Sequence, residues 1–275
     1  MAHPFPSTLN ALVTAALAAL AGGRPDVVLR LALAMLAIQV AIGAANDAVD
    51  AERDAAVKPS KPIPSGLADP SAVYLLAAGA LGCGLLLAAS VSPGSLAIGA
   101  AGAAAGLAYD LRLKGTALSW LPFAVGIPLL PLFAWWGVRG TAPPALLVAA
   151  ALAVPAGAAL AVANSLPDAE RDGRSGIRSL AVALGRPRAA LLVAALEVLV
   201  GVAAVGSFTL LGGTSRGITP AVGVMALGLL MLGGGVALGA RPSVDARQRG
   251  WELQAVGLAL LGASWVGGLA AAGAL

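Results

Sequence analysis

The chain has 275 residues, of which 59% are hydrophobic and 11% are charged, and its mean hydropathy is +0.90. Soluble globular domains carry about 25% charged residues, so this chain lacks the charge to cover a soluble surface, and its apolar content excludes disorder. Gly and Ala are abundant and aromatic residues make up only 4%, which suits closely packed transmembrane helices and not an outer-membrane barrel with aromatic girdles. The composition therefore predicts an all-α, polytopic membrane protein.

Interruptions of the apolar pattern divide the chain into nine predicted transmembrane spans, most of them within the roughly 17–25 residues that cross a bilayer. The spans are residues 7–22, 26–46, 72–90, 93–109, 118–138, 143–163, 188–207, 219–240 and 252–273. Residues 1–8 carry no basic stretch, so we expect no cleaved signal peptide. We expect a single domain over residues 1–275, with two long polar loops at about 46–70 and 164–188.

Basic residues gather on one side of the predicted membrane. With nine spans, the two long loops and two shorter connectors, 110–117 and 241–250, alternate onto one side and hold 13 of the 17 Lys and Arg residues. The positive-inside rule makes this side cytoplasmic. We therefore expect an integral protein of a bacterial cytoplasmic membrane whose active site faces the cytoplasm. The net charge of +4 then reflects topology, and we expect no nucleic-acid partner.

The pentapeptide DAERD occurs twice, at 50–54 and 168–172, and the two copies are 118 residues apart. Each copy follows an apolar span and has an Asn four residues before its first Asp. Residues four apart share one helix face, so each copy forms a polar stripe if its span continues as helix into the loop. The stripes are Asn46, Asp50 and Asp54, bordered by Asp47, and Asn164, Asp168 and Asp172.

Clustered carboxylates repel one another unless a cation neutralises them, and carboxylate and amide oxygens select a hard ion such as Mg²⁺. Mg²⁺ completes its shell with water and substrate phosphates, so two such stripes suit a diphosphate held by metal ions. The alternative is that DAERD is a solvated loop with local ion pairs; the duplication favours the metal–phosphate site. Nearby basic residues fit phosphate binding, although topology alone would also place them there: Lys58, Lys61, Arg112, Lys114, Arg171, Arg174 and Arg178.

Three stretches of the chain resemble signatures of the UbiA-type intramembrane prenyltransferases. Asn46–Gly66, NDAVDAERDAAVKPSKPIPSG, resembles the family's NDxxDxxxD motif and the following R-P-[IL]-P-S-G loop, with Lys61 where the family usually has Arg. Pro167–Gly185 resembles the second signature, DxxxD followed by G-[IV]-x-[ST]-L. Ala108–Thr116, AYDLRLKGT, resembles the Y-[DS]-x-x-[LF]-K segment. The three signatures occur in the family's order along nearly the whole chain.

The resemblance implies a bundle of about nine helices around a central cavity, Mg²⁺ as cofactor, a polyprenyl diphosphate as donor, and transfer of its prenyl group to an aromatic or lipid-type acceptor. The implied catalytic residues are Asp50, Asp54, Asp168, Asp172 and Lys114, and the implied metal ligands are Asn46, Asp47, Asp50, Asp54, Asp168 and Asp172. The resemblance also implies diphosphate binding by Asn46 and Lys61. The second stripe and the charges beside it predict the same role for Asn164 and Arg178. Tyr109 either presents its ring to the carbocation of the substrate or is an aromatic residue of the membrane interface.

Two other functions remain open at this point. A carrier of an anionic amphiphile also shows repeated halves, but carriers place their ionisable residues near mid-membrane and at broken helices, whereas these acids follow the spans. An intramembrane terpene cyclase would use the same diphosphate chemistry. Glu197, inside the seventh span, and Gln39, seven residues before Asn46, are either functional or helix–helix hydrogen-bonding groups.

Overall fold

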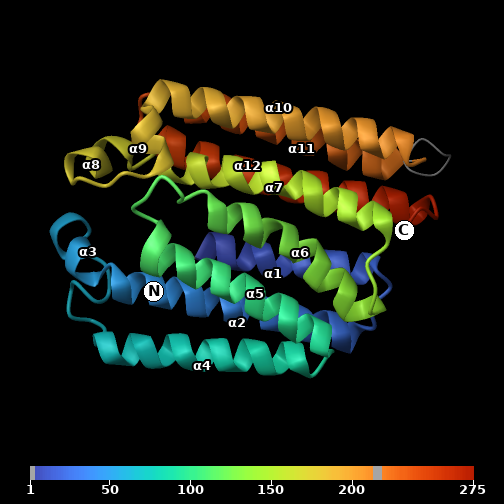
Figure 1. Ribbon diagram of the computed structural model, residues 1–275, viewed down its shortest axis with the longest axis horizontal. Helices are drawn as coiled ribbons and strands as arrows, with labels where there is room; N and C mark the ends of the chain where they lie inside the picture. The colour runs from blue at the N-terminus through green and yellow to red at the C-terminus, as the bar shows by residue number, and fades with distance from the viewer. Residues whose placement is uncertain (1–3, 213–218) are drawn as a thin grey trace. The chain divides into compact units, whose positions relative to one another are not determined.

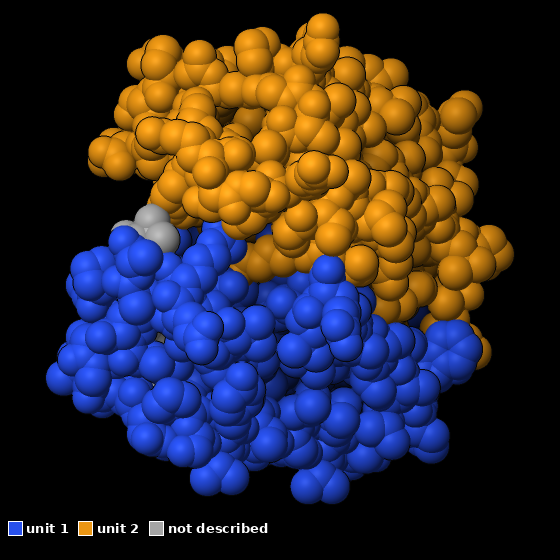
Figure 2. Space-filling view, turned by 60° about the vertical axis from the view of Figure 1, so that its left-hand side comes forward, with its two compact units in different colours: residues 1–112, 133–140 blue, residues 113–132, 141–275 orange. Residues whose placement is uncertain are grey.

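The computed structural model describes residues 4–212 and 219–275, and every regular element within them is a helix (Figure 1). Residues 1–3, which belong to the segment considered for a signal peptide, lie outside the described residues. The chain divides into two compact units, residues 1–112 with 133–140 and residues 113–132 with 141–275 (Figure 2). The prediction of an all-α fold is confirmed; the central cavity and the single domain stay predictions.

The first unit is organised around α2. It contains α1 (Pro4–Leu20), α2 (Pro25–Val49), α3 (Ala51–Val57), α4 (Pro70–Ala89), α5 (Pro93–Ala108) and a π-helical turn, η1 (Tyr109–Leu113). α2 packs against α1, α4 and α5, and its buried face includes Leu31, Ala34 and Ile38. This face is built mainly from small and aliphatic residues, which lets the neighbouring helices approach closely.

The second unit contains α7 (Pro144–Ser165), α8 (Ala169–Arg174), α9 (Leu180–Leu184), α10 (Arg186–Leu210), α11 (Thr219–Gly239) and α12 (Val244–Ala271). α6 (Leu121–Arg139) contributes residues to both units. α7 packs against α10 and α12, and α11 packs along α12.

Glycines set the distance between α11 and α12. A Cβ added at Gly250 of α12 would lie 2.7 Å from the Gly235 carbonyl oxygen of α11, and one added at Gly257 would lie 2.8 Å from the Gly228 carbonyl oxygen. Only residues without a side chain allow two helix backbones to approach this closely. These glycine pairs therefore fix the position of α12 beside α11. The first turn of α12 contains Arg247, which belongs to the site described below.

Eight helices are long and apolar enough to cross a membrane: α2, α4, α5 with η1, α6, α7, α10, α11 and α12, all within residues 4–212 and 219–275. The ninth predicted span, residues 7–22, corresponds to α1, which has 17 residues. Eight of the nine predicted spans thus coincide with a helix long enough to cross a membrane, and the ninth coincides with the shorter apolar helix α1; the protein is an integral membrane protein. α4 and α5 begin with Pro in the first helical turn, and Asp69 and Ser92 cap them by accepting hydrogen bonds from backbone amides.

The start of the last span was predicted wrongly. It was expected at residue 252, because 241–250 is polar, but α12 begins at Val244. Ser243 caps this helix by accepting a hydrogen bond from the Ala246 amide at 3.4 Å. The first two turns of α12 therefore carry polar residues, among them Arg247.

The duplicated pentapeptide has the same local structure in both copies: a long helix, a break, and a short helix. α2 ends at Val49 and α3 begins at Ala51; α7 ends at Ser165 and α8 begins at Ala169. The condition set for the two stripes, that each span continues as unbroken helix into its loop, is therefore not met. In the second copy Pro167, which lacks an N–H and clashes with the preceding turn, explains the break.

Candidate active site

The first acidic motif holds one cation between two buried carboxylates. Asp47 at the end of α2 and Asp54 in α3 are each 6% exposed. The Lys61 ammonium lies 2.8 Å from Asp47 Oδ1 and 2.6 Å from Asp54 Oδ2. Both carboxylates are therefore in local ion pairs, as the solvated-loop alternative expects, but they are buried, which that alternative does not expect.

The ion pairs determine the charge of Lys61. Partial burial disfavours the ammonium form, but the hydrogen bonds and charges of Asp47 and Asp54 outweigh it and raise the pKa of Lys61 above its ordinary 10.5. Lys61 is therefore a permanent cation at neutral pH.

The break after α2 leaves the first stripe in place. The Asp50 amide still donates to the Asn46 carbonyl oxygen at 2.9 Å, and the Asp54 amide donates to the Asp50 carbonyl oxygen at 2.8 Å. Asn46, Asp50 and Asp54 thus keep the four-residue spacing predicted from the sequence, although Asp50 forms the junction between two helices. Asp50 is half-buried.

Asn46 is oriented by a residue that the sequence analysis did not single out. Its side-chain amide nitrogen donates to Asp110 Oδ1 at 2.7 Å, and both side chains are buried. Asp110 belongs to η1, which also contains the half-buried Tyr109. π-helical turns inserted at the end of an α-helix are frequent at functional sites, because they redirect side chains. In the sequence, the signal for this contact was Asp110 itself, the one acidic residue of the AYDLRLKGT segment.

The second motif pairs with an arginine from within its own pentapeptide. Arg171 Nη2 lies 2.8 Å from Asp168 Oδ2, and Arg171 Nε lies 4.0 Å from Asp172 Oδ1. Asp168 precedes the first turn of α8, and the Asp172 amide donates to the Asp168 carbonyl oxygen at 2.8 Å. Asn164 is half-buried in the last turn of α7, and the break at Pro167 separates it from the two aspartates.

Two predicted phosphate-binding residues are brought together by backbone contacts. The Arg178 amide donates to the Gly115 carbonyl oxygen at 3.1 Å, next to Lys114. The Leu180 amide donates to Ser119 Oγ at 3.4 Å. The segment that follows η1 is therefore hydrogen-bonded to the segment that follows α8. The Arg178 side chain is exposed and that of Lys114 is half-buried.

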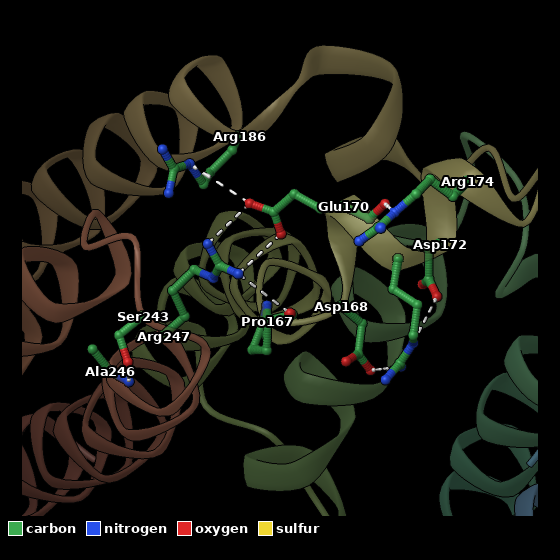
Figure 3. A network of polar contacts seen from close by, with 10 residues as sticks. Pro167, Asp168, Glu170, Asp172, Arg174, Arg186, Ser243, Ala246 and Arg247 are labelled. Carbon is green, nitrogen blue, oxygen red and sulfur yellow. Dashed lines mark hydrogen bonds and ion pairs between the residues drawn. The ribbon is translucent and has the colours of Figure 1, made fainter. Parts of the chain in front are cut away.

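The sequence analysis treated Arg247 only as a topology charge, whereas the structure makes it part of this region. Arg247 is 2% exposed and donates from Nη1 and Nη2 to the two carboxylate oxygens of Glu170, at 3.1 and 2.9 Å (Figure 3). The same Nη2 lies 3.4 Å from the Pro167 carbonyl oxygen, and Arg186 Nε lies 3.8 Å from Glu170 Oε1. The Ser243 cap, which starts α12 before residue 252, was the sequence signal that could have placed Arg247 on this helix.

The donor atoms of the two motifs suit a hard divalent cation. No three His, Cys, Asp or Glu side chains among residues 4–212 and 219–275 are grouped around a single point that would hold a metal ion. The Lys61 ammonium lies between Asp47 and Asp54, and the atoms that contact it are carboxylate oxygens. Carboxylate oxygens are ligands that fit Mg²⁺.

Two intramembrane polar residues differ in their surroundings. Glu197 of α10 is 4% exposed, and neither carboxylate oxygen has a hydrogen-bond partner within the described part of the chain. Gln39 of α2 is half-buried, and its amide lies 3.8 Å from the sulfur of Met35 on the same helix. Among residues 4–212 and 219–275, neither residue forms the helix–helix hydrogen bond that was one of the two alternatives.

Comparison with known proteins gives one consistent result. Residues 7–251 match the UbiA prenyltransferase family. The digeranylgeranylglyceryl phosphate synthase of Methanopyrus kandleri is 32% identical over 189 residues, which cover 67% of this chain and 68% of that protein. A UbiA homologue from Aeropyrum pernix superposes with a TM-score of 0.75 at 17% identity, covering 94% of this chain and 97% of the other. A UbiA homologue from Archaeoglobus fulgidus, solved with DMAPP and Mg²⁺, gives a TM-score of 0.70 at 14% identity and covers 94% of this chain and 96% of the other.

The family match extends over all three sequence signatures; it begins within α1, covers the helices α2 to α11, and ends in α12. It favours an enzyme over a carrier of an anionic amphiphile. The chain belongs to the UbiA prenyltransferase family and is a prenyltransferase.

Proposed function

We propose that the protein transfers a prenyl group, in an Mg²⁺-dependent reaction, from a polyprenyl diphosphate to an acceptor within the membrane and releases diphosphate. The observation that carries this proposal is the cation held between two buried carboxylates, Asp47 and Asp54, in the motif that resembles the family's first signature. The solved homologue from Archaeoglobus fulgidus that binds DMAPP and Mg²⁺ supports the choice of donor and ion.

The metal-binding groups are proposed to be Asn46, Asp47, Asp50 and Asp54 of the first motif and Asp168 and Asp172 of the second. Bound Mg²⁺ supplies positive charge at the oxygens on which negative charge develops as the diphosphate leaves.

The basic residues are proposed to stabilise the departing diphosphate. Lys114 and Arg178, brought together through the Gly115 carbonyl, provide one point charge and one bidentate fork. Lys61 supplies a third charge and Asn164 a hydrogen-bonding amide, and Tyr109 is proposed to turn its ring toward the allylic cation.

In the proposed reaction the bond between the allylic carbon and the diphosphate oxygen breaks, and both bonding electrons leave with the diphosphate. A nucleophilic atom of the acceptor then bonds to the allylic carbon and loses its proton. The Ala-, Gly- and Leu-rich helices exclude water, which would otherwise capture the cation.

The acceptor is proposed to be lipid-type, with a free hydroxyl on a phosphorylated glycerol. The support is the 32% identity to a protein named digeranylgeranylglyceryl phosphate synthase. An aromatic acceptor is the alternative, and a terpene cyclase would release diphosphate with no acceptor at all. Omitting the acceptor from the assay separates the cyclase from the other two.

The two units are proposed to form one catalytic domain with its active site toward the cytoplasm of a bacterial cell. The support is the charge asymmetry, because 13 of the 17 basic residues lie in connectors assigned to one side. Cysteines introduced singly at exposed Lys58 and at exposed Arg24, which lies in the connector between the first two spans, should react with an impermeant thiol reagent from opposite sides of the membrane, after Cys83 is replaced by Ser.

The test of the metal assignment is the pair of variants Asp50→Ala and Asp168→Ala. We expect each to abolish Mg²⁺-dependent diphosphate release from a polyprenyl diphosphate in membranes. Glu52→Ala is the matched control, because Glu52 lies within the first pentapeptide but is exposed. Full turnover in both Asp variants would refute the assignment, and product mass with glycerol phosphate lipids or aromatic acids would identify the acceptor class.

A further inference from the structure

Arg247 contacts residues that come before and after Asp168 in the sequence. Its guanidinium donates to both Glu170 oxygens, at 3.1 and 2.9 Å, and lies 3.4 Å from the carbonyl oxygen of Pro167 (Figure 3). Pro167 and Glu170 flank Asp168 in the sequence, so one side chain from α12 fixes the turn in which α8 begins. A guanidinium that binds a carboxylate through two parallel N–H groups fixes orientation as well as distance.

The contact between Arg247 and Glu170 lies on the side of α8 opposite to Asp168 and Asp172. Asp168 and Asp172 are four residues apart and share one side of the helical turn, whereas Glu170 is two residues from each and points to the opposite side. In Figure 3 Glu170 is directed toward Arg186 and Arg247, and Asp168 and Asp172 are directed elsewhere. The contact therefore sets the rotation of α8 about its own axis without occupying the two aspartates.

α8 needs such a contact, because a helix of six residues does not persist in isolation. The break at Pro167 also uncouples it from α7. α12 can hold α8 in place because α12 itself packs against α7 and α11. Its close contact with α11 is made by the glycine pairs, and one of these glycines, Gly250, lies one turn after Arg247.

The first copy of the pentapeptide shows that the contact is not a general property of DAERD. Glu52 and the corresponding Glu170 are both exposed, but Glu52 forms no ion pair with any described residue, whereas Glu170 pairs with Arg247. In that copy Lys61 links the two helices through Asp47 and Asp54 instead. The two motifs are thus held by different means, one through its aspartates and one through its glutamate.

We propose that Arg247, acting through Glu170, is a positioning residue that aims Asp168 and Asp172 for metal binding. This inference rests on the proposed function, because it assigns those aspartates to a metal site. Neither Arg247 nor Glu170 touches the metal or the diphosphate; both act through the orientation of α8.

The experiment compares Glu170→Gln, Arg247→Gln and Arg247→Lys with two matched controls, Glu52→Gln and Arg249→Gln. Arg249 lies in the same turns of α12 but is exposed. The first readout is Mn²⁺ binding to the full-length protein in detergent, measured by electron paramagnetic resonance. The second is hydrogen–deuterium exchange of residues 167–174 in the absence of metal, and thermal unfolding is recorded for every variant.

We expect Glu170→Gln and Arg247→Gln to weaken Mn²⁺ binding about 10–100-fold, the range typical of lost outer-shell partners of metal ligands. Exchange in 167–174 should become faster, while exchange in α12 beyond Gly250 should not change. Arg247→Lys keeps the charge but loses the fork, so it should fall between wild type and Arg247→Gln. The double variant Glu170→Gln/Arg247→Gln should bind Mn²⁺ as tightly as the single variant with the lower Mn²⁺ affinity, because the two residues act through one shared contact.

Wild-type affinity and exchange in Glu170→Gln would overturn the inference, and so would equal losses in the Glu52 and Arg249 controls. If Arg247→Gln does not fold, Glu170→Gln and Arg247→Lys decide the question. If wild-type protein and Asp168→Ala bind Mn²⁺ equally, the proposed function fails at its metal site. In that case unchanged exchange in 167–174 of Glu170→Gln would show separately that Arg247 does not hold α8.

Discussion

Asn46 donates a hydrogen bond from its side-chain nitrogen to Asp110 Oδ1, 2.7 Å away and 64 residues later in the chain. The Asn46 side-chain nitrogen is the donor in this contact, and the Asp110 carboxyl oxygen is the acceptor. The amide oxygen of Asn46 then faces the other way and is the atom available to a cation. Asp110 thus determines which end of Asn46 serves the proposed metal site.

Replacing Asn46 by Asp should disrupt this contact, because two buried carboxylates would meet at hydrogen-bond distance. We expect Asn46→Asp to lose about 2 kcal/mol of stability, within the roughly 1–3 kcal/mol for a buried polar group without its partner. The double variant Asn46→Asp/Asp110→Asn restores one donor and one acceptor and should regain most of it. Thermal unfolding in detergent measures both, and a double variant no more stable than the single one would contradict the assigned pairing.

Removing Lys61 should expose the repulsion between Asp47 and Asp54. We expect Lys61→Gln to lose about 2 kcal/mol in the absence of metal, less than the roughly 3–5 kcal/mol for fully buried pairs, because the Lys61 side chain is 22% exposed. Added Mg²⁺ should narrow the gap to wild type by supplying another cation. Lys58→Gln, at an exposed lysine of the same loop, is the control. A gap that Mg²⁺ leaves unchanged would argue against a metal position between these carboxylates.

The same pair predicts a pH dependence with a defined sign. The pKa of Lys61 is raised by Asp47 and Asp54 against the effect of burial, so the ammonium form is stabilised in the folded protein. Its contribution is complete below the ordinary pKa of 10.5 and is lost as the pH rises through the higher folded-state value. The difference in unfolding free energy between wild type and Lys61→Gln should therefore stay constant through the neutral range and shrink only in strong alkali. A difference that already falls near neutral pH would contradict this charge state.

Much of the fold could be predicted from the sequence, because burial in lipid requires long apolar helices and connectors interrupt them with charge, Pro and Gly. The nine spans follow from this rule, and the one misplaced start, that of α12, lies where Arg247 and Arg249 make a helical segment look like a loop. Hydropathy cannot distinguish a polar helical turn from a polar connector. The Ser243 cap distinguishes them.

The candidate site was predictable where it depends on local spacing and not where it depends on contacts between distant segments. The four-residue spacing of Asn46, Asp50 and Asp54 survives a helix break, because the backbone hydrogen bonds continue through it. The bonds from Asn46 to Asp110 and from Arg247 to Glu170 join residues 64 and 77 positions apart, and no periodicity encodes them. In the sequence Glu170 is only the middle of a repeated pentapeptide, and the equivalent Glu52 of the first copy, which is exposed as Glu170 is, forms no ion pair with any described residue.

Replacing Glu197 by Leu should stabilise the protein. The carboxylate is 4% exposed, and neither oxygen has a hydrogen-bond partner among the described residues, so its burial is not compensated there. We expect Glu197→Leu to gain about 1–3 kcal/mol, the penalty for a buried polar group without a partner. Thermal unfolding in detergent measures the gain, and diphosphate release in the same preparation reports whether the acid also has a function. A less stable Glu197→Leu would show that Glu197 makes a stabilising contact.

The glycine pair between α11 and α12 predicts that a single methyl group at the right place disturbs both the fold and the second acidic motif. A Cβ at Gly250 would lie 2.7 Å from the Gly235 carbonyl oxygen and 2.7 Å from the Gly239 amide nitrogen. Both are backbone atoms, which cannot rotate away as a side chain would, so the helices must separate. We expect Gly250→Ala to lose about 1–3 kcal/mol, the usual cost of overpacking, although Ala favours helix by about 1 kcal/mol over Gly.

Gly262→Ala is the matched control for this prediction, because Gly262 lies on the same helix and a Cβ there meets nothing within 4 Å. It should be neutral or slightly stabilising in thermal unfolding. Because Gly250 follows Arg247 by one turn, Gly250→Ala should also speed hydrogen–deuterium exchange in residues 167–174, whereas Gly262→Ala should not. Equal stability of the two variants would show that α11 and α12 tolerate separation. A destabilised Gly250→Ala with unchanged exchange in 167–174 would show that α8 keeps its position without support from α12.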